Sequence, residues 1–246
     1  MLGKVKFIGL QNYFDLFDDP LMGKSIYNTI YYSILLVPSQ TLLGFALAWL
    51  LYKKFRGVTF FRTIFYLPVV LSYVVIATIF KIVLNADIGL INSFLHLFGI
   101  ASQPFLTSTS QALPSIVAMS TWKWVGTSMI IFIGGLNDIP ESYYEAAALD
   151  GGSQSQQLIY ITLPMLKRVT SFVLVINTTN AFKLFTPVYI MTNGGPNYST
   201  LVSVYYSFIT AFRYQNFGYA SAIAILLLAI VMVLTIIQLK LMKSDY

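Results

Sequence analysis

Apolar residues along the chain fall into five long segments that polar stretches separate. The first segment, residues 28–52, contains no charged residue over 25 positions. Folded as a helix with a rise of 1.5 Å per residue, it would extend about 37 Å, more than the bilayer core of roughly 30 Å. Four further segments are comparable, and they cover residues 63–84, 113–136, 169–191 and 217–239. The pattern predicts an all-α fold, a polytopic transmembrane helical bundle with five spans in this chain.

A polar stretch between the third and fourth segments predicts two short helices joined by a turn. The first helix covers PESYYEAAALD, which is rich in the helix formers Ala, Glu and Leu, and Pro140 suits its first position. We expect Gly151 and Gly152 to end this helix with positive φ angles. Ser153 and Gln156 have the spacing of a capping box, which predicts the start of the second helix.

Three further segments carry local signals. Pro164 lacks an N–H and disfavours helical backbone at Leu163, so we expect a break or a kink there. Residues 85–111 are expected to form a loop that includes a short interfacial helix, INSFLHLFGI. Residues 192–216 are expected to form a second loop, in which TNGGPN is a strong turn signal.

The positions of Lys and Arg predict the orientation of the chain, because basic residues gather on the cytoplasmic side of a membrane. With residues 137–165 inside, the inner segments contain Lys53, Lys54, Arg56, Arg62, Lys167, Arg168, Lys240 and Lys243. The outer segments contain Lys4, Lys6, Lys24 and Arg213. This asymmetry predicts an external N-terminal segment over residues 1–27, a transmembrane domain over 28–240 with a cytoplasmic region at 137–165, and a cytoplasmic tail over 241–246.

Composition supports an integral membrane protein. Hydrophobic residues make up 57% of the chain and charged residues 10%, whereas soluble domains contain about 25% charged residues. The net charge of +6 comes from residues beside the apolar segments, which favours membrane lipid over nucleic acid as a partner. The chain contains no Cys, which excludes disulfides, Cys-ligated zinc and thiol nucleophiles.

The sequence does not indicate catalytic chemistry. The single histidine, His96, lies in a predicted loop without the partners that a metal site or a Ser-His pair requires. No Gly-rich phosphate loop of the form Gly-x4-Gly-Lys-Ser/Thr is present, so we do not expect this chain to bind ATP phosphates. We therefore expect no catalytic residue, no metal site and no cofactor in this chain.

The stretch over residues 145–164 resembles a motif of a known family. It reads Glu-Ala-Ala, three residues, Gly, nine residues, Ile, one residue and Leu-Pro, as in the membrane permease subunits of binding-protein-dependent ABC importers. The resemblance is strongest to the carbohydrate-uptake branch of the maltose-transporter type. It covers nearly the whole chain, through pieces such as FIGLQNYFDLF, NTIYYS and TNGGPNYST. The motif residues are Glu145, Ala146, Ala147, Asp150, Gly151, Ile161, Leu163 and Pro164.

The resemblance implies a type I importer permease fold and a role as half of a membrane channel for a mono- or oligosaccharide. The implied partners are a second homologous permease, two ATPase subunits that bind ATP and Mg²⁺ inside, and an external substrate-binding protein. The motif residues would couple the chain to an ATPase through a helix-in-groove contact. The implied location is the plasma or inner membrane of a prokaryotic cell, which the chain crosses several times.

One departure from the family concerns the start of the chain. Family members have another membrane helix ahead of the FIGLQNYF stretch, and Met1 falls where an external loop is expected to be under way. We therefore expect a truncated chain or a misplaced start.

Other functions are weighed against this one. The same transporter type could carry a non-sugar solute such as glycerol phosphate. An ion-coupled secondary transporter is disfavoured, because the five apolar segments contain no Asp or Glu for proton coupling. A membrane-embedded enzyme would need a nucleophile and a base within the spans, and a scaffold would not transport a solute.

Polar residues within the apolar segments are candidates for a substrate pathway. Asn177, Asn180 and Lys183 are spaced three apart, which places them on one helical face suited to sugar hydroxyls. Alternatively, the amides bond neighbouring helices, and Lys183 extends to the membrane surface. Trp122, beside Lys123, is a further pathway candidate, with anchoring at the membrane interface as its alternative.

Overall fold

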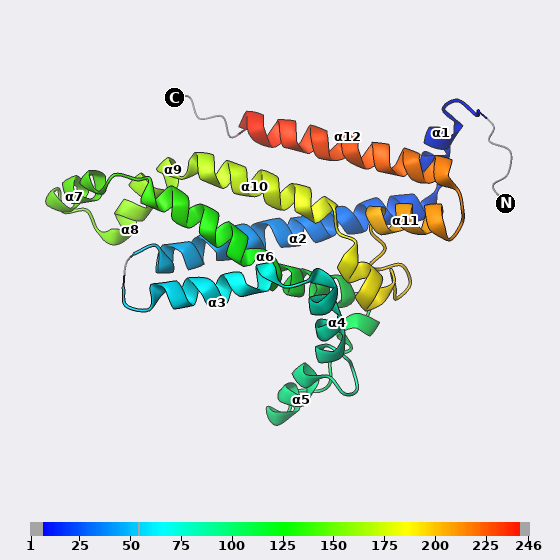
Figure 1. Cartoon of the computed structure of the whole chain (residues 1–246), viewed down its shortest axis with the longest axis horizontal. Helices are drawn as coiled ribbons and strands as arrows, with labels where there is room; N and C mark the ends of the chain where they lie inside the picture. Colours follow the sequence, from blue (N-terminus) through cyan, green and yellow to red (C-terminus); the bar gives the residue numbers. More distant parts are fainter. Residues whose placement is uncertain (1–6, 54, 242–246) are drawn as a thin grey trace. The chain divides into compact units, whose positions relative to one another are not determined.

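Helices account for every regular element in the part of the chain that the structure, a computed structural model, describes (Figure 1). The structure describes residues 7–53 and 55–241. Lys4, Lys6, Lys54, Lys243 and all of the expected tail except Leu241 lie outside the described residues. The α-helices are α1 (Gln11–Asp18), α2 (Pro20–Leu51), α3 (Val58–Val70), α4 (Tyr73–Val83), α5 (Leu90–Leu97), α6 (Ala112–Asn137), α7 (Glu141–Leu149), α8 (Gln154–Gln157), α9 (Leu163–Met165), α10 (Lys167–Phe182), α11 (Ser203–Phe212) and α12 (Phe217–Leu241). The other elements are the 3₁₀ turn η1 (Phe105–Thr107) and the π-helical segments η2 (Leu158–Thr162) and η3 (Val188–Thr192).

The helices form two compact units. Unit one contains Met1–Ser33, Tyr73–Ile116 and Ala181–Met232, and unit two contains Ile34–Ser72, Val117–Asn180 and Val233–Tyr246. Four helices, α2, α6, α10 and α12, contribute residues to both units. Each unit has buried contacts of its own, which position the candidate functional residues of that unit.

Among residues 7–53 and 55–241, three helices are long and apolar enough to cross a membrane, namely α2, α6 and α12. They confirm three of the five helices that the apolar segments predict. α2 begins earlier than expected, at Pro20, because proline suits the first helical turn and Asp19 Oδ1 accepts the backbone N–H of Leu21 at 2.8 Å.

The span predicted over residues 63–84 is not one straight helix, although the bent pair of helices there is long and apolar enough to cross a membrane together. The chain forms two helices there, α3 and α4, which differ in direction by 96°. Leu71, directly after α3, has extended backbone with φ of −71° and ψ of 150°. Pro68 lies in the last turn of α3, where its missing N–H removes one bond of the helical ladder and favours a break.

The apolar segment over residues 169–191 does not form one unbroken helix either. α10 ends at Phe182, and the π-helical segment η3 begins only at Val188. A helix that continued from α10 would need the Pro187 N–H as donor to the Lys183 carbonyl, and proline has no N–H, so the helix breaks over residues 183–185 and resumes at Thr186. The proline therefore accounts for the interruption.

Both predicted loops contain regular structure. The loop over residues 85–111 contains the expected short helix as α5, followed by η1. Residues 192–216 are not one loop, since α11 occupies ten of them. The TNGGPN turn is confirmed, because Asn193 and Gly194 have φ angles of 51° and 82°.

The core of unit two is built around α6. Glycines let neighbouring helices approach α6 closely, as is typical of helix packing in membranes. A Cβ atom added at Gly126 would meet the Phe65 carbonyl oxygen and lie 2.9 Å from Tyr66 Cα of α3. A Cβ added at Gly135 would lie 2.6 Å from Val169 Cγ2 of α10. The buried apolar residues of this core are Ala48, Leu51, Met129, Phe132, Ile133, Leu136, Ile139, Leu166 and Val173.

We expect Gly126→Ala to lower the thermal stability of the purified protein, because the new methyl group would press against the α3 backbone. Overpacking of this kind costs about 1–3 kcal/mol. Gly134→Ala is the matched control, since a Cβ there meets no atom within 4 Å and alanine is the better helix former. Equal melting temperatures for the two variants would contradict the close α3–α6 packing.

Unit one contains a carboxylate that joins three helices. The Oδ2 atom of Asp19, at the start of α2, accepts hydrogen bonds from the Tyr206 hydroxyl of α11 and the Tyr219 hydroxyl of α12, the latter at 2.6 Å. Both tyrosines are more than 90% buried. Burial raises the pKa of the Asp19 carboxyl, but these two hydrogen bonds, with further ones from the α2 backbone, hold it below its ordinary value of 3.8.

The lowered pKa of Asp19 predicts a loss of stability in acid. An aspartate with a depressed pKa in the folded state stabilises the protein above about pH 4, and this contribution disappears as the pH falls through the folded pKa. At pH 7, Asp19→Asn should lower the melting temperature by roughly 2–4 °C, the equivalent of about 1 kcal/mol. The difference between variant and wild type should shrink below pH 4, and a difference that does not depend on pH would contradict the assignment.

Candidate functional site

The motif region over residues 145–164 begins in α7, which ends in a Schellman motif. The Gly151 N–H donates to the Ala148 carbonyl at 3.1 Å, and the Gly152 N–H donates to the Ala147 carbonyl at 2.8 Å. Gly151 has a φ of 80°, as the sequence predicts. Gly152 does not have a positive φ, so that part of the prediction is wrong; a Cβ there would instead lie 2.8 Å from the Ala147 oxygen. Pro140 directly precedes the helix as its N-cap rather than occupying its first position.

The second half of the region is helical but irregular. The capping box of Ser153 and Gln156 is present, as predicted. The expected break or kink is present but lies three residues later than predicted: Leu163 has helical angles, and the direction of the chain changes by 65° at Leu166. The π-helical segment η2 directly before Leu163 has a wider turn, which accommodates a proline at position 164 without ending the helix.

One side-chain pair attaches α7 to this second half. The hydroxyls of Tyr144 and Thr162 are 2.9 Å apart, and Thr162 is fully buried. Tyr144 and Ile161 also pack against the core of unit two. The contact between Tyr144 and Thr162 was not predicted, because residues 18 positions apart leave no local pattern in the sequence.

The motif residues themselves are largely accessible. Glu145, Ala146, Asp150, Gly151, Leu163 and Pro164 are exposed, whereas Ala147 and Ile161 are half-buried. No residue of α7 is buried. Large apolar side chains are exposed beside them, with Leu149 at 89% and Tyr160 at 75%. An exposed apolar surface of this kind is typical of an interaction site.

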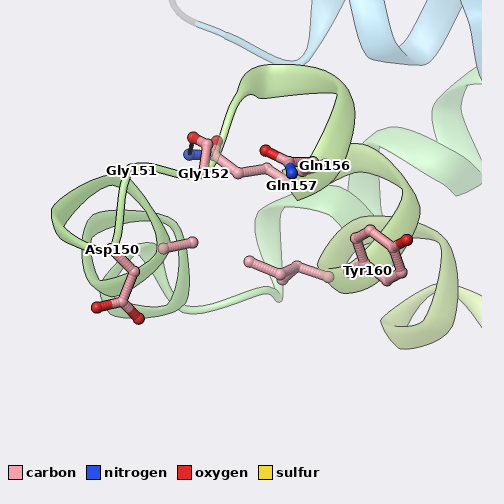
Figure 2. A pocket seen from close by; sticks show the side chains of 8 residues that line it. Asp150, Gly151, Gly152, Gln156, Gln157 and Tyr160 are labelled. Atoms are coloured by element: carbon pink, nitrogen blue, oxygen red, sulfur yellow. Dashed lines mark hydrogen bonds between the residues drawn. The ribbon is translucent and has the colours of Figure 1, made fainter.

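A shallow cavity of about 290 Å³ separates the two halves of the motif region. Figure 2 shows Asp150 on the α7 side of this cavity and Gln156 and Gln157 on α8 across from it. Tyr160 lies on the segment that follows α8. The cavity and the exposed residues give this end of unit two a contoured surface, and Figure 1 shows α7 and α8 together there.

Lys123 of α6 closes the end of α3. Its ammonium group donates to the carbonyl oxygens of Pro68 at 3.0 Å, Val69 at 3.3 Å and Leu71 at 2.9 Å. The side chain is 2% exposed, and Nζ lies 4.5 Å from the centre of the Trp124 ring. A cation is favourable at a helix C-terminus, where carbonyls lack partners. This contact was not predicted; the signals from which it could have been found are a lysine within one apolar segment and a proline within another.

Lys123→Met should destabilise the protein, because it removes the donor from three carbonyl groups. Hydrogen bonds to charged groups contribute about 1.5–3 kcal/mol each, so we expect a loss of at least about 2 kcal/mol. Lys123→Arg retains a donor cation and should lose less. A thermal shift assay on the purified variants measures both, and a methionine variant as stable as the wild type would contradict the capping role.

Asn177 lies where helices meet. Its amide Nδ2 donates to Thr41 Oγ1 of α2 at 3.3 Å and to Ser128 Oγ of α6 at 3.2 Å. The neighbouring Thr178 accepts a hydrogen bond from Gln238 Nε2 of α12 at 2.8 Å. These contacts agree with the alternative that the amides bond neighbouring helices, and a pathway role for Asn177 stays a prediction.

The three residues of the predicted polar face do not share one environment. Asn177 is buried, whereas Asn180 is exposed. Lys183 is not on the helix at all, because α10 ends at Phe182, so the expectation of a continuous helical stripe is wrong. Trp122 is 46% exposed on α6. Pathway roles for Asn180, Lys183 and Trp122 stay predictions.

Comparisons with known proteins agree on one class of protein. Residues 40–243 match the family described as "Binding-protein-dependent transport system inner membrane component". The chain is 37% identical to the probable ABC transporter permease protein YurN of Bacillus subtilis (strain 168), over 97% of this chain and 83% of the relative. It is 33% identical to the arabinooligosaccharides transport system permease protein AraP of the same organism, over 98% of this chain and 78% of that protein.

A solved structure has the same fold. It is a chain of a bacterial ABC transporter involved in the import of the acidic polysaccharide alginate, and it superimposes with a TM-score of 0.88. The match covers 97% of this chain and 85% of that chain, at 22% sequence identity.

Proposed function

The chain belongs to the family of binding-protein-dependent transport system inner membrane components, and we propose that it forms half of the translocation pathway of an ATP-driven importer for a saccharide. The name of the arabinooligosaccharide permease, which is 33% identical, supports a sugar as the transported solute. The same transporter type carrying a non-sugar solute such as glycerol phosphate is the alternative.

The energy in this proposal comes from partner subunits. Two ATPase subunits bind ATP and Mg²⁺ on the cytoplasmic side, and a second homologous permease completes the channel. An external binding protein delivers the saccharide, in keeping with the description of the family. The family's membership of this transport class also counts against an ion-coupled secondary transporter.

The surface of α7 is the observation that carries the proposed coupling to ATP hydrolysis. No residue of this helix is buried, and large apolar side chains are exposed by Leu149 at its end and by Tyr160 on the segment that follows α8. A nine-residue helix is too short to be stable alone in water, so it needs contacts on more than one side. The Tyr144–Thr162 contact provides one side, and a groove of an ATPase subunit provides the other as a helix-in-groove interface.

Gly151→Val should disrupt this coupling. A β-branched residue is disfavoured at a φ of 80° by more than about 1 kcal/mol, so the end of α7 would rearrange and lose its register with the groove. Gly151→Asn is the matched control, because asparagine tolerates left-handed backbone. Glu145→Lys reverses an exposed charge on the same helix without changing its backbone.

The test uses the complete importer, purified and reconstituted in vesicles with its binding protein. We expect the valine and lysine variants to reach normal membrane levels but to lose co-purifying ATPase or saccharide-dependent ATP hydrolysis by at least fivefold, while the asparagine variant stays near wild type. Normal ATPase binding and uptake in both affected variants would contradict the coupling role. Uptake of glycerol phosphate but of no saccharide by the wild type would instead support the non-sugar alternative.

A further inference from the structure

A second polar cavity, of about 420 Å³, lies within unit one and is separate from the residues considered so far. One wall is a single face of α2, formed by Lys24, Tyr27, Asn28 and Tyr31. These residues follow the spacing i, i+3, i+4 and i+7, which places their side chains on the same side of a helix. The volume falls within the range of about 300–1,000 Å³ for small-molecule sites.

The other walls come from distant parts of the sequence. Thr109 and Ser110, directly before α6, contribute exposed hydroxyl groups. The last residue of the TNGGPN turn, Asn197, and the segment directly after it, with Ser199, form the third wall. It is fixed to α2 by Asn28, whose Nδ2 donates to the carbonyls of Tyr198 and Leu201, each at 2.8 Å. These two hydrogen bonds hold the wall formed by residues 197–199 in place against α2.

Two tyrosines on the α2 wall form an accessible aromatic surface. The rings of Tyr27 and Tyr31 are parallel within 2°, with centroids 6.3 Å apart, and they are 61% and 37% exposed. The Lys24 ammonium lies 5.6 Å from the Tyr27 centroid. A flat aromatic face with hydroxyl and ammonium groups around it suits a molecule that has an apolar face and a polar rim. A sugar ring has this form, with axial C–H groups on its face and hydroxyls around its edge.

A buried hydroxyl in the cavity wall also points to a ligand. Ser199 is 91% buried, and its hydroxyl has no hydrogen-bond partner among the described residues. A buried hydroxyl without a partner costs about 1–3 kcal/mol, so a fold gains by supplying one. A hydroxyl group of a bound ligand can meet this need after a small movement of the wall.

We propose that this cavity is a saccharide subsite of unit one, in which a sugar ring packs on Tyr27 and Tyr31. Its hydroxyls are held by Lys24, Ser199 and the groups before α6. The inference rests on the proposed saccharide transport and adds a contact site that none of Trp122, Asn177, Asn180 and Lys183 belongs to. A docked loop of the binding protein is the competing occupant.

Direct binding to the importer separates these possibilities. The importer complex is placed in nanodiscs without the binding protein, and its affinity for arabinotriose and for maltotriose is measured by isothermal titration calorimetry. Tyr27→Ala and Lys24→Gln should weaken binding of the recognised trisaccharide by about fivefold or more, while Tyr27→Phe, which keeps the ring, should bind like the wild type. Tyr214→Ala is the matched control, because this tyrosine is 65% exposed and does not line the cavity.

Parallel measurements decide between the occupants. If Tyr27→Ala leaves trisaccharide affinity unchanged but weakens capture of the sugar-free binding protein, the cavity is a protein contact and the proposal is overturned. It is overturned as well if all variants match the wild type while vesicles still accumulate a saccharide, and the proposed transport then stands. If wild-type vesicles accumulate no saccharide, the proposed function fails, and this inference fails with it.

Discussion

The requirement that every backbone carbonyl in an apolar surrounding finds a donor governs how this chain ends its helices. An interrupted helix leaves carbonyls without partners, and a bilayer offers no water to satisfy them. In this chain, long cationic side chains from neighbouring segments donate hydrogen bonds to these carbonyls. Lys123 reaches the end of α3, and Arg62 reaches the end of α2, where its guanidinium donates to the Leu51 carbonyl at 2.6 Å. The Lys123 contact stabilises the chain where it bends by 96° between α3 and α4, and the Arg62 contact caps the end of the unbroken helix α2.

The exposed end of unit two combines a rigid base with an adaptable edge. Tyr144 and Thr162 fix α7 to the π-helical segment, and the core around α6 supports both. The edge consists of the short helix α7, in which no residue is buried. Such a surface transmits force only if a partner completes it, so the geometry suits a joint between subunits better than a self-contained site.

The sequence predicted the parts of the fold that depend on local chemistry. Three membrane-length helices out of the five predicted spans, the capping box at Ser153 and the positive φ of Gly151 follow from residue type and spacing, and these are present. The interruptions within residues 63–84 and 169–191 were not predicted. Hydrophobicity indicates the length of an apolar segment but not a break or a change of direction within it. The contact of Tyr144 with Thr162 and the cavity beside Tyr27 depend on tertiary packing, which leaves no periodic signal. The bend expected at Leu163 lies three residues later, because the wider π-helical turn before Pro164 accommodates the missing N–H.

The long sequence separation of the contacts in unit one sets an order on its assembly. Asp19 bonds to Tyr219, 200 positions later, and Asn28 bonds to the Leu201 carbonyl, 173 positions later. A ribosome releases these partners only when most of the chain has already been made. The Asp19 carboxylate and the Asn28 amide of α2 are therefore made before their native partners exist, and they stay without those partners until residues 198–219 have been made. Unit one can therefore form its long-range hydrogen bonds only near the end of synthesis. A nascent chain that stops before residue 198 lacks the partners of both Asp19 and Asn28.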